Sequence, residues 1–407
     1  MMHLNNYQFL KKKENLVLFL LVFLSVLIRI PIILIYGDTN LENEWAALVN
    51  NLISHGTLSY KSFEDFLLPN LFMPPLYAYY LYVFSFLNLA EQNYINLVLL
   101  SQALLASISI VVFYKINKIF FSEKVSFYSS LLFSFFPLHV YACSQISSVS
   151  LQSFFLILFF YFIFKLVEKK NFLSIFIFSF ISGLLILLRG EFFVILIFSF
   201  LYLFFFLKVK LKNILFIILI TLITVSPYLI RNIVIFEKIT ITKSLGYNFW
   251  KGNNPNSTVE GSVFTNDNLK KEIYDIPKDK FFRINFDKIF MNEAKKNITN
   301  EPQKYLILFL KKIASFLFID INSSQSNYYN PLHYLPIVLL GITSLIGIII
   351  SDKKSYKMNY LIFVFFFNII IFSSFFILAR YKLAILPLQI IFTNVLINHL
   401  KNNFFKT

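Results

Sequence analysis

The strongest constraint on the fold of this chain is a series of apolar runs, each close to the length that an α-helix needs to cross a bilayer. The runs recur along the whole 407-residue sequence, so a soluble domain with a single membrane anchor does not fit. The content of 57% hydrophobic and 14% charged residues also departs from that of soluble globular chains. We therefore predict an all-α integral membrane protein with many spans.

Lysine clusters between these runs predict the topology, because short basic loops stay in the cytoplasm. Lys11 to Lys13 precede the first run, residues 16–36, which places the N-terminus inside and the next polar loop outside. The short runs 74–89 and 304–318 are expected to be interfacial helices, since counting either as a span would place later lysine clusters outside. About ten spans result, with both termini in the cytoplasm. The expected spans are residues 16–36, 94–116, 125–141, 151–164, 172–188, 192–207, 214–230, 332–350, 360–378 and 383–400.

This topology divides the chain into three parts. Residues 1–230 form an N-terminal transmembrane catalytic module whose acidic outer loop is 37–93; residues 231–330 form an extracytoplasmic loop with an interfacial helix; residues 331–407 hold the last transmembrane helices. The net charge of +16 comes from short lysine clusters and not from one basic face, so membrane lipids, and no nucleic acid, are the expected partners. The single cysteine, Cys143, rules out an intrachain disulfide.

The polar loop after the first run carries the candidate catalytic residues. Asp38, Glu42 and Glu44 fall within seven positions, although carboxylates are scarce elsewhere in the chain and are costly when they face lipid. A carboxylate at this place could act as a general base toward an attacking hydroxyl. From Leu41 onward the spacing of apolar residues predicts a short amphipathic helix on the membrane surface. Each acid taken singly could instead be only a cap or first-turn residue of that helix.

Basic residues at the outer boundary are candidates for holding a lipid phosphate. Arg380 and Lys382 interrupt two apolar runs at that boundary, and Arg231 follows another run, so these cations could stabilise a departing phosphate. A short hairpin or an interfacial anchor would use the same polar residues at 380–382.

A segment rich in Gly, Asn and Pro supplies the candidate sugar-binding residues Trp250, Lys251 and Asn253. Tryptophan beside asparagine suits stacking on a sugar ring and hydrogen bonding to its hydroxyls. A loop that Trp250 merely packs onto the membrane would show the same residues.

Four features, in this order along most of the chain, resemble a known family. They are Glu42 and Glu44 before Trp45-Ala46, the segment Pro74-Pro75-Leu76-Tyr77, the segment 227–232 leading to 250–255, and Arg380-Tyr381 near the last span. With them the chain resembles the bacterial members of the polytopic glycosyltransferases that use polyprenyl-phosphate sugars, the group with the protein O-mannosyltransferases and the lipid A aminoarabinose transferases. The resemblance implies the GT-C fold, an acidic base in the first outer loop and inversion at the anomeric carbon.

The sequence departs from the family pattern at the acidic loop. Family members often show Asp-Glu three to four residues before an aromatic-Ala pair, whereas here Leu41 stands four residues before Trp45 and Glu42 stands three before it. The resemblance therefore leaves the base open among Glu42, Glu44 and Asp38. A second acid that some relatives carry after the third span is missing from residues 143–152, so no metal site built from that pair is expected. No cofactor is predicted, and a divalent cation is left open.

The predicted function is transfer of a sugar from a polyprenyl-phosphate donor to a glycan, lipid or protein acceptor, on the periplasmic face of a bacterial inner membrane. A polysaccharide polymerase or ligase is an alternative that would depend mainly on arginines in large outer loops. A lipid-linked glycan flippase or transporter is another, but it should carry charges in mid-span. Here Arg29, Arg189 and Glu191 lie near the outer ends of spans, and Arg29 is expected to snorkel to the interface.

Overall fold

The computed structural model describes residues 2–41, 43–63, 66–168, 171–323, 330–352 and 354–404, and within these ranges the predicted all-α fold is confirmed. The helices of the main bundle are α1 (Met2–Tyr36), α4 (Glu91–Asn117), α5 (Glu123–Phe135), α6 (Pro137–Tyr141), α7 (Val149–Glu168), α8 (Phe172–Leu188), α9 (Phe192–Phe205), α10 (Leu211–Phe236), α15 (Pro331–Ile349), α16 (Tyr356–Ser374) and α17 (Leu386–Phe404). The other elements are α2 (Asn43–His55), β1 (Ser59–Phe63), β2 (Phe66–Pro69), α3 (Pro75–Ser85), the 3-10 turns η1 (Ala142–Ser144) and η3 (Ala379–Ala384), α11 (Leu245–Gly252), α12 (Asp267–Tyr274), α13 (Phe282–Asn300) and α14 (Pro302–Leu317).

The membrane-spanning character of the bundle is confirmed, but the predicted count of ten spans is not. Six described helices are long and apolar enough to cross a membrane, or seven if α5 and the segment after it form one bent span, while α8 and α9 are shorter apolar helices. The bent pair turns by 55° at Phe136, which has an extended backbone. Pro137 explains the break, because the residue before a proline avoids the helical conformation.

The packing of the bundle relies on phenylalanine and on close helix contacts. Phe159 and Phe178 stack with their centroids 5.0 Å apart between α7 and α8, and Phe365 meets Phe392 edge to face at 5.5 Å between α16 and α17. A Cβ added at Gly183 of α8 would lie 2.5 Å from the side chain of Thr224 on α10. Small residues at such crossings bring helices together where lipid gives no hydrophobic driving force.

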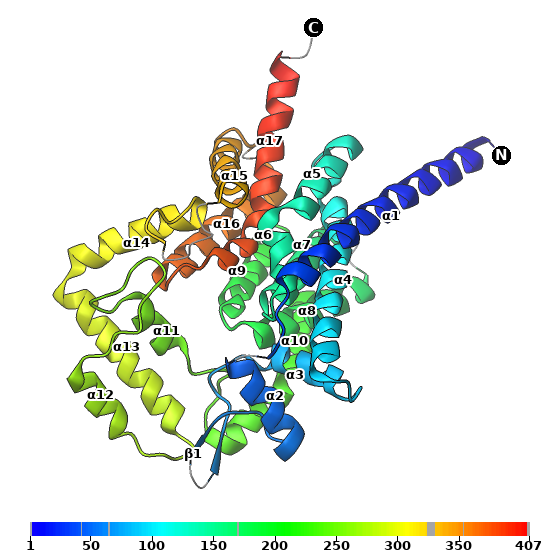
Figure 1. The fold of residues 1–407 in the computed structure, drawn as a ribbon. Helices are drawn as coiled ribbons and strands as arrows, with labels where there is room; N and C mark the ends of the chain where they lie inside the picture. The colour runs from blue at the N-terminus through cyan, green and yellow to red at the C-terminus, as the bar shows by residue number, and fades with distance from the viewer. Residues whose placement is uncertain are drawn as a thin grey trace.

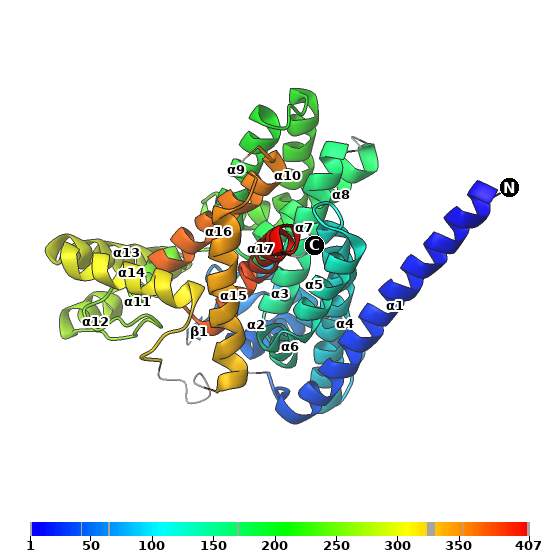
Figure 2. The ribbon, with the colours of Figure 1, turned by 90° about the horizontal axis from the view of Figure 1, so that it is seen from above.

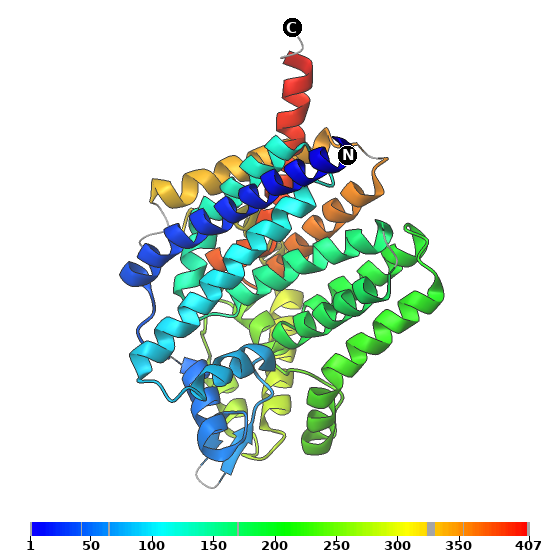
Figure 3. The ribbon, with the colours of Figure 1, turned by 90° about the vertical axis from the view of Figure 1, so that its right-hand side faces the viewer.

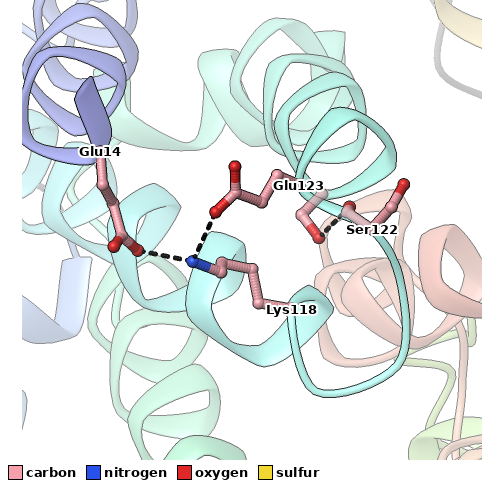
Figure 4. A network of polar contacts seen from close by, with 5 residues as sticks. Glu14, Lys118, Ser122 and Glu123 are labelled. Carbon is pink, nitrogen blue, oxygen red and sulfur yellow. Dashed lines mark hydrogen bonds and ion pairs between the residues drawn. The ribbon is translucent and has the colours of Figure 1, made fainter. Parts of the chain in front are cut away.

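Both ends of the chain lie at one end of the bundle, opposite the β1–β2 hairpin (Figures 1 and 3). Near that end Lys118, which follows α4, contacts Glu14 of α1 at 2.9 Å and Glu123 of α5 at 3.2 Å (Figure 4). These three helices are thus tied together by one partly exposed lysine, a contact that contributes modestly to stability.

The segments between the bundle helices form two small structures. The antiparallel hairpin β1–β2 packs on α2, which packs in turn on α3. Helices α11 to α14 form a lobe beside the bundle, on the side away from α1 (Figure 2). The predicted helices after Leu41, over 74–89 and over 304–318 correspond to α2, α3 and α14. The apolar face of α2 was expected to meet the membrane surface, but Leu48, Val49 and Leu52 are buried within the protein.

Arg29 does not snorkel to the interface, contrary to the prediction. Its side chain is fully buried, and its Nη1 donates to Ser25 Oγ at 2.6 Å and to the carbonyl of Ser134 at 3.2 Å. Its Nη2 lies 2.8 Å from His139 Nδ1. A polar cage formed by α1, α5 and α6 therefore solvates this cation inside the protein, as buried charges require.

Candidate active site

A cavity of 1310 Å³ is bordered by the loop after α1, by α2, by the segment between α6 and α7, and by α11 and η3. Four of the predicted site residues line it: Asp38, Glu44, Lys251 and Arg380. They come from segments far apart in sequence, so the fold has gathered two acids and two cations around one space. Glu42, the third candidate base, lies outside the described residues.

Asp38 is held in place by the backbone between α6 and α7. Its own N–H donates to the carbonyl of Ser144 at 2.9 Å, and its carboxylate Oδ2 accepts the N–H of Ile146 at 2.6 Å. Gln102 of α4 donates to the carbonyl of Gln145 at 2.9 Å, which fixes the same segment from the other side. The carboxylate therefore has a defined orientation at the wall of the cavity.

Glu44 stands in the first turn of α2, where the helix dipole favours an anion. The next residue, Trp45, packs edge to face on Tyr77 of α3 with the ring centroids 4.7 Å apart. Tyr77 is fully buried and donates its hydroxyl to Gln102 at 2.9 Å. This aromatic contact fixes the start of α2, and with it the position of Glu44 at the cavity.

Lys251 and Arg380 bring positive charge to the same cavity. Lys251 Nζ lies 4.6 Å from the ring centroid of Phe376. Arg380 is exposed and lies in η3, the 3-10 turn after α16. Burial, and then the charge of Arg380, lower the pKa of Lys251, while Glu44 acts in the opposite direction. Neither cation makes an ion pair with a described carboxylate. Such a pair of cations can receive a phosphate group.

Arg189 is a further cavity residue that the sequence showed only as an outer-face cation. Its Nε contacts Glu191 Oε1 at 2.6 Å, and its Nη1 donates to Gln152 Oε1 at 2.8 Å. Its guanidinium carbon also lies 5.1 Å from the ring of Tyr381. Glu191 already compensates the charge of Arg189, so Arg189 is less available to an anion than Lys251 or Arg380.

Lys382 and Arg231, two residues predicted to bind phosphate, donate hydrogen bonds to backbone carbonyls. Lys382 is buried, and its Nζ donates to the carbonyls of Ser315, Phe316 and Phe318 at the end of α14. Arg231 Nη1 donates to the carbonyl of Asn70 at 2.8 Å, which joins α10 to the loop after β2. Backbone carbonyls therefore already occupy these two cations.

Two of the three predicted sugar-binding residues, Trp250 of α11 and Asn253 directly after it, make packing and backbone contacts. Trp250 is 1% exposed and lies 4.5 Å from Phe290 of α13, centroid to centroid. Asn253 Nδ2 donates to the carbonyls of Phe249 at 2.8 Å and Ser374 at 2.9 Å. Together they hold α11 between α13 and α16, which presents the adjacent Lys251 to the cavity.

Sequence reasoning missed the wall formed by residues 145–148. Gln145, Ile146, Ser147 and Ser148 all line the cavity. In the sequence they form a polar interval between two apolar runs, and this interval lacks the second acid of the family pattern. Among the described residues, no three His, Cys, Asp or Glu side chains gather in a metal-binding arrangement.

Comparisons with known proteins agree with this architecture. Residues 72–230 match the family model described as dolichyl-phosphate-mannose-protein mannosyltransferase. The fold is similar to that of the archaeal oligosaccharyltransferase AglB from Archaeoglobus fulgidus in complex with an inhibitory peptide and a dolichol-phosphate, with a TM-score of 0.58 and 12% identity over 95% of this chain and 50% of that chain. The Archaeoglobus fulgidus oligosaccharyltransferase tethered to an acceptor peptide gives a TM-score of 0.57 and 13% identity with the same coverage.

The chain has the GT-C fold of the polytopic glycosyltransferases, and the resemblance to that superfamily predicted from its sequence is confirmed. Its residues 72–230 are, more narrowly, similar to the dolichyl-phosphate-mannose-protein mannosyltransferases. The chain spans about half the length of the solved structures that it matches. A comparison with curated protein sequences finds no match.

Proposed function

We propose that this protein is a membrane glycosyltransferase that moves a sugar from a polyprenyl-phosphate donor to an acceptor at the outer face of a bacterial inner membrane. The observation that carries this proposal is the cavity in which Glu44 and Asp38 lie with Lys251 and Arg380. After the larger effect of burial, the charge of Arg380 lowers the pKa of Lys251 and the charge of Glu44 raises it. These effects support the closeness of the three charged groups.

The shape of the cavity supports a lipid-linked donor. Its lining continues between α9 and α10 as an apolar wall, and several of these side chains are exposed. Members of this wall are Phe193, Ile197, Phe200, Ile218 and Leu222. An apolar wall beside a cationic pair suits a polyprenyl chain joined to a phosphate.

The proposed reaction is a single displacement. The acceptor oxygen attacks the anomeric carbon of the sugar while a carboxylate takes the hydroxyl proton. The bond between the anomeric carbon and the phosphate oxygen breaks, and its electron pair leaves with the polyprenyl phosphate. Lys251 and Arg380 stabilise the negative charge that develops on this leaving group, which therefore needs no proton from an acid.

Glu44 is the proposed base among the described acids. Asp38 already accepts a backbone N–H at 2.6 Å, so part of its carboxylate is engaged with the chain. Glu44 makes no hydrogen bond or ion pair within the described part of the chain and lies in the first turn of α2. Asp38 is proposed to orient a substrate hydroxyl. Glu42 stays a candidate base on sequence grounds.

The test is transfer of radiolabelled sugar from a panel of polyprenyl-phosphate donors by the purified protein in nanodiscs. We expect Glu44→Gln to reduce kcat by about 10²- to 10⁴-fold, as loss of a general base does. Lys304→Gln, a change at an exposed residue of α14, is the matched control. Full transfer by a variant that lacks Glu42, Glu44 and Asp38 together would refute the acidic-loop mechanism. Translocation of a lipid-linked glycan without a new glycosidic bond would favour a flippase.

Loss of either cation of the pair Lys251 and Arg380 should raise the KM for the donor and leave the KM for the acceptor unchanged. In Lys251→Gln and Arg380→Gln, one charge-assisted contact to the phosphate is removed, so we expect KM for the donor to rise by about tenfold or more in each. The check is a full kinetic series with the donor varied at a fixed acceptor concentration, and then the reverse. A rise in acceptor KM alone would contradict the assignment of these cations to the donor phosphate.

A further inference from the structure

A second cavity, of 510 Å³, adjoins the candidate active site on the side of the β1–β2 hairpin and α13. Its lining is formed by Ala47, Tyr60, Lys61, Phe72, Tyr247, Phe282, Arg283 and Phe286. Tyr60, Phe72 and Tyr247 also line the main cavity, so the two spaces share one wall. The proposed reaction assigns no role to this second cavity.

Arg283 and Lys61 give the second cavity a positive character. Arg283 is 6% exposed, and its guanidinium carbon lies 4.6 Å from the ring centroid of Phe72 and 5.0 Å from that of Tyr60. Lys61 Nζ lies 4.9 Å from the ring of Phe282. Neither Arg283 nor Lys61 forms an ion pair with any carboxylate that the structure describes. Aromatic faces stabilise these cations only in part, so both can still bind an anion.

The two cations also repel each other. Burial first, and then the charges of Arg283 and Lys278, lower the pKa of Lys61. Two like charges, those of Lys61 and Arg283, therefore line one cavity. A bound anion would relieve this repulsion, as it would for any cluster of one sign.

The aromatic residues of the second cavity present surfaces that suit a sugar. Tyr60 and Phe72 stack with their centroids 5.4 Å apart and their planes at 17°, and Tyr247 meets Phe72 edge to face at 5.7 Å. The apolar face of a sugar ring packs well on such rings. Aromatic rings beside cations thus match a sugar that carries a negative group.

Glu44 lines the main cavity, and Ala47, three residues later on α2, lines the second one. The charge of Glu44 contributes to raising the pKa of both Tyr60 and Tyr247, after the larger effect of burial in each case. The proposed base is therefore close to the shared wall. A hydroxyl of a ligand in the second cavity could reach Glu44 from one side while the donor phosphate lies on Lys251 and Arg380 at the other.

We propose that the second cavity binds the acceptor, and that the acceptor is an anionic saccharide whose carboxylate or phosphate group contacts Arg283 and Lys61. This inference rests on the proposed glycosyl transfer and specifies its acceptor class. It assigns separate cations to the two substrates: Lys251 and Arg380 to the donor, and Arg283 and Lys61 to the acceptor.

Binding of oligosaccharides without any donor tests this proposal directly. The probes are an oligouronate and its carboxyl-reduced counterpart, and a phosphorylated oligosaccharide and its dephosphorylated counterpart, titrated by calorimetry against the full chain in nanodiscs. At least one anionic probe should bind about tenfold more tightly than its neutral counterpart, as expected for a charge-assisted contact. The identity of that probe distinguishes a carboxylate from a phosphate.

Variants of Arg283 and Lys61 test whether these two side chains cause the preference for the anionic probe. Arg283→Gln and Lys61→Gln should each remove most of the preference for the anionic probe, whereas Lys270→Gln on the exposed face of α12 should keep it. Lys61 is exposed, so its variant remains informative if Arg283→Gln fails to fold. Equal affinity for charged and neutral probes, or an anionic preference that survives both changes, would overturn the proposal. If the preference depends on Arg283 while no donor supports transfer, the binding site stands and the proposed reaction fails.

Discussion

Lys312 and Lys382 each place a buried ammonium group against carbonyl oxygens at a helix end. Lys312 Nζ donates to the carbonyl of Gly252 at 2.7 Å, where α11 ends, and Lys382 Nζ reaches the carbonyls at the end of α14. The carbonyl end of a helix favours a cation, which offsets part of the penalty for burying these charges. Burial still lowers the pKa of each lysine to about 7.

Replacement of Lys312 by methionine should flatten the dependence of stability on pH. In the unfolded chain this lysine has its ordinary pKa of 10.5, whereas in the folded chain its pKa is about 7. Between these values the unfolded state binds more protons, so the native protein gains stability as pH rises from about 7 toward 10.5. The variant lacks this gain. Thermal unfolding in detergent across this range should show the Tm of the native protein rising relative to that of Lys312→Met, and parallel curves would contradict the assignment.

At the scale of elements, α11 is positioned by glycines at both of its ends. A Cβ added at Gly246 would lie 2.0 Å from the carbonyl of Asp287 on α13, and one added at Gly252 would lie 1.9 Å from the carbonyl of Phe375 at the end of α16. The Asp287 carboxylate also accepts the N–H of Gly246 at 2.7 Å, at the first turn of α11. These contacts fix α11 at both ends, and Lys251 lies in the helix between the two glycines.

Gly252→Ala should therefore move α11 away from α16. We expect a loss of stability of about 1–3 kcal/mol, the usual range for overpacking, together with a higher KM for the donor because Lys251 is displaced. Gly190→Ala is a matched control for stability, since the nearest atom to its Cβ would be Thr242 Oγ1 at 3.8 Å. The measurement is thermal unfolding of both variants beside the native protein. Equal Tm values for the two variants would show that the contact of Gly252 with Phe375 does not constrain α11.

At the scale of the whole molecule, the candidate active site and the chain termini lie at separate ends of the bundle. The β1–β2 hairpin, α2 and the two cavities lie at one end, while α1 begins and α17 finishes at the other (Figures 1 and 3). This arrangement agrees with the lysine pattern, which predicts cytoplasmic termini and an outer acidic loop.

Labelling with a membrane-impermeant maleimide tests this orientation in intact cells that have lost their outer membrane. The single native thiol, Cys143, is buried and should stay unlabelled. Glu272→Cys on α12 is expected to react from outside, and Asn402→Cys near the end of α17 only after permeabilisation. The reverse pattern would place the candidate site in the cytoplasm and exclude transfer at the outer face.

Much of the fold could be predicted because lipid restricts the possible structures. Backbone groups in a bilayer must be paired within the segment, so each apolar run had to be a helix, and α4, α7 and α10 appear where the runs stand. The β1–β2 hairpin and the helices α12 and α13 were not predicted. They lie in polar segments whose residues pack on other parts of the protein. The spacing of apolar residues in these segments does not indicate such contacts.

The sequence by itself determined the class of fold and the loop that carries the acids. It also showed which cations lie between apolar runs, because charge and apolar length are properties of the residues themselves. Only the tertiary structure decided that Lys251 and Arg380 reach the cavity, while Arg231 and Lys382 bind backbone carbonyls and Trp250 packs on Phe290. The physical reason is that a cation or a ring is available to a ligand only if its neighbours leave it without a partner, and those neighbours come from distant parts of the chain.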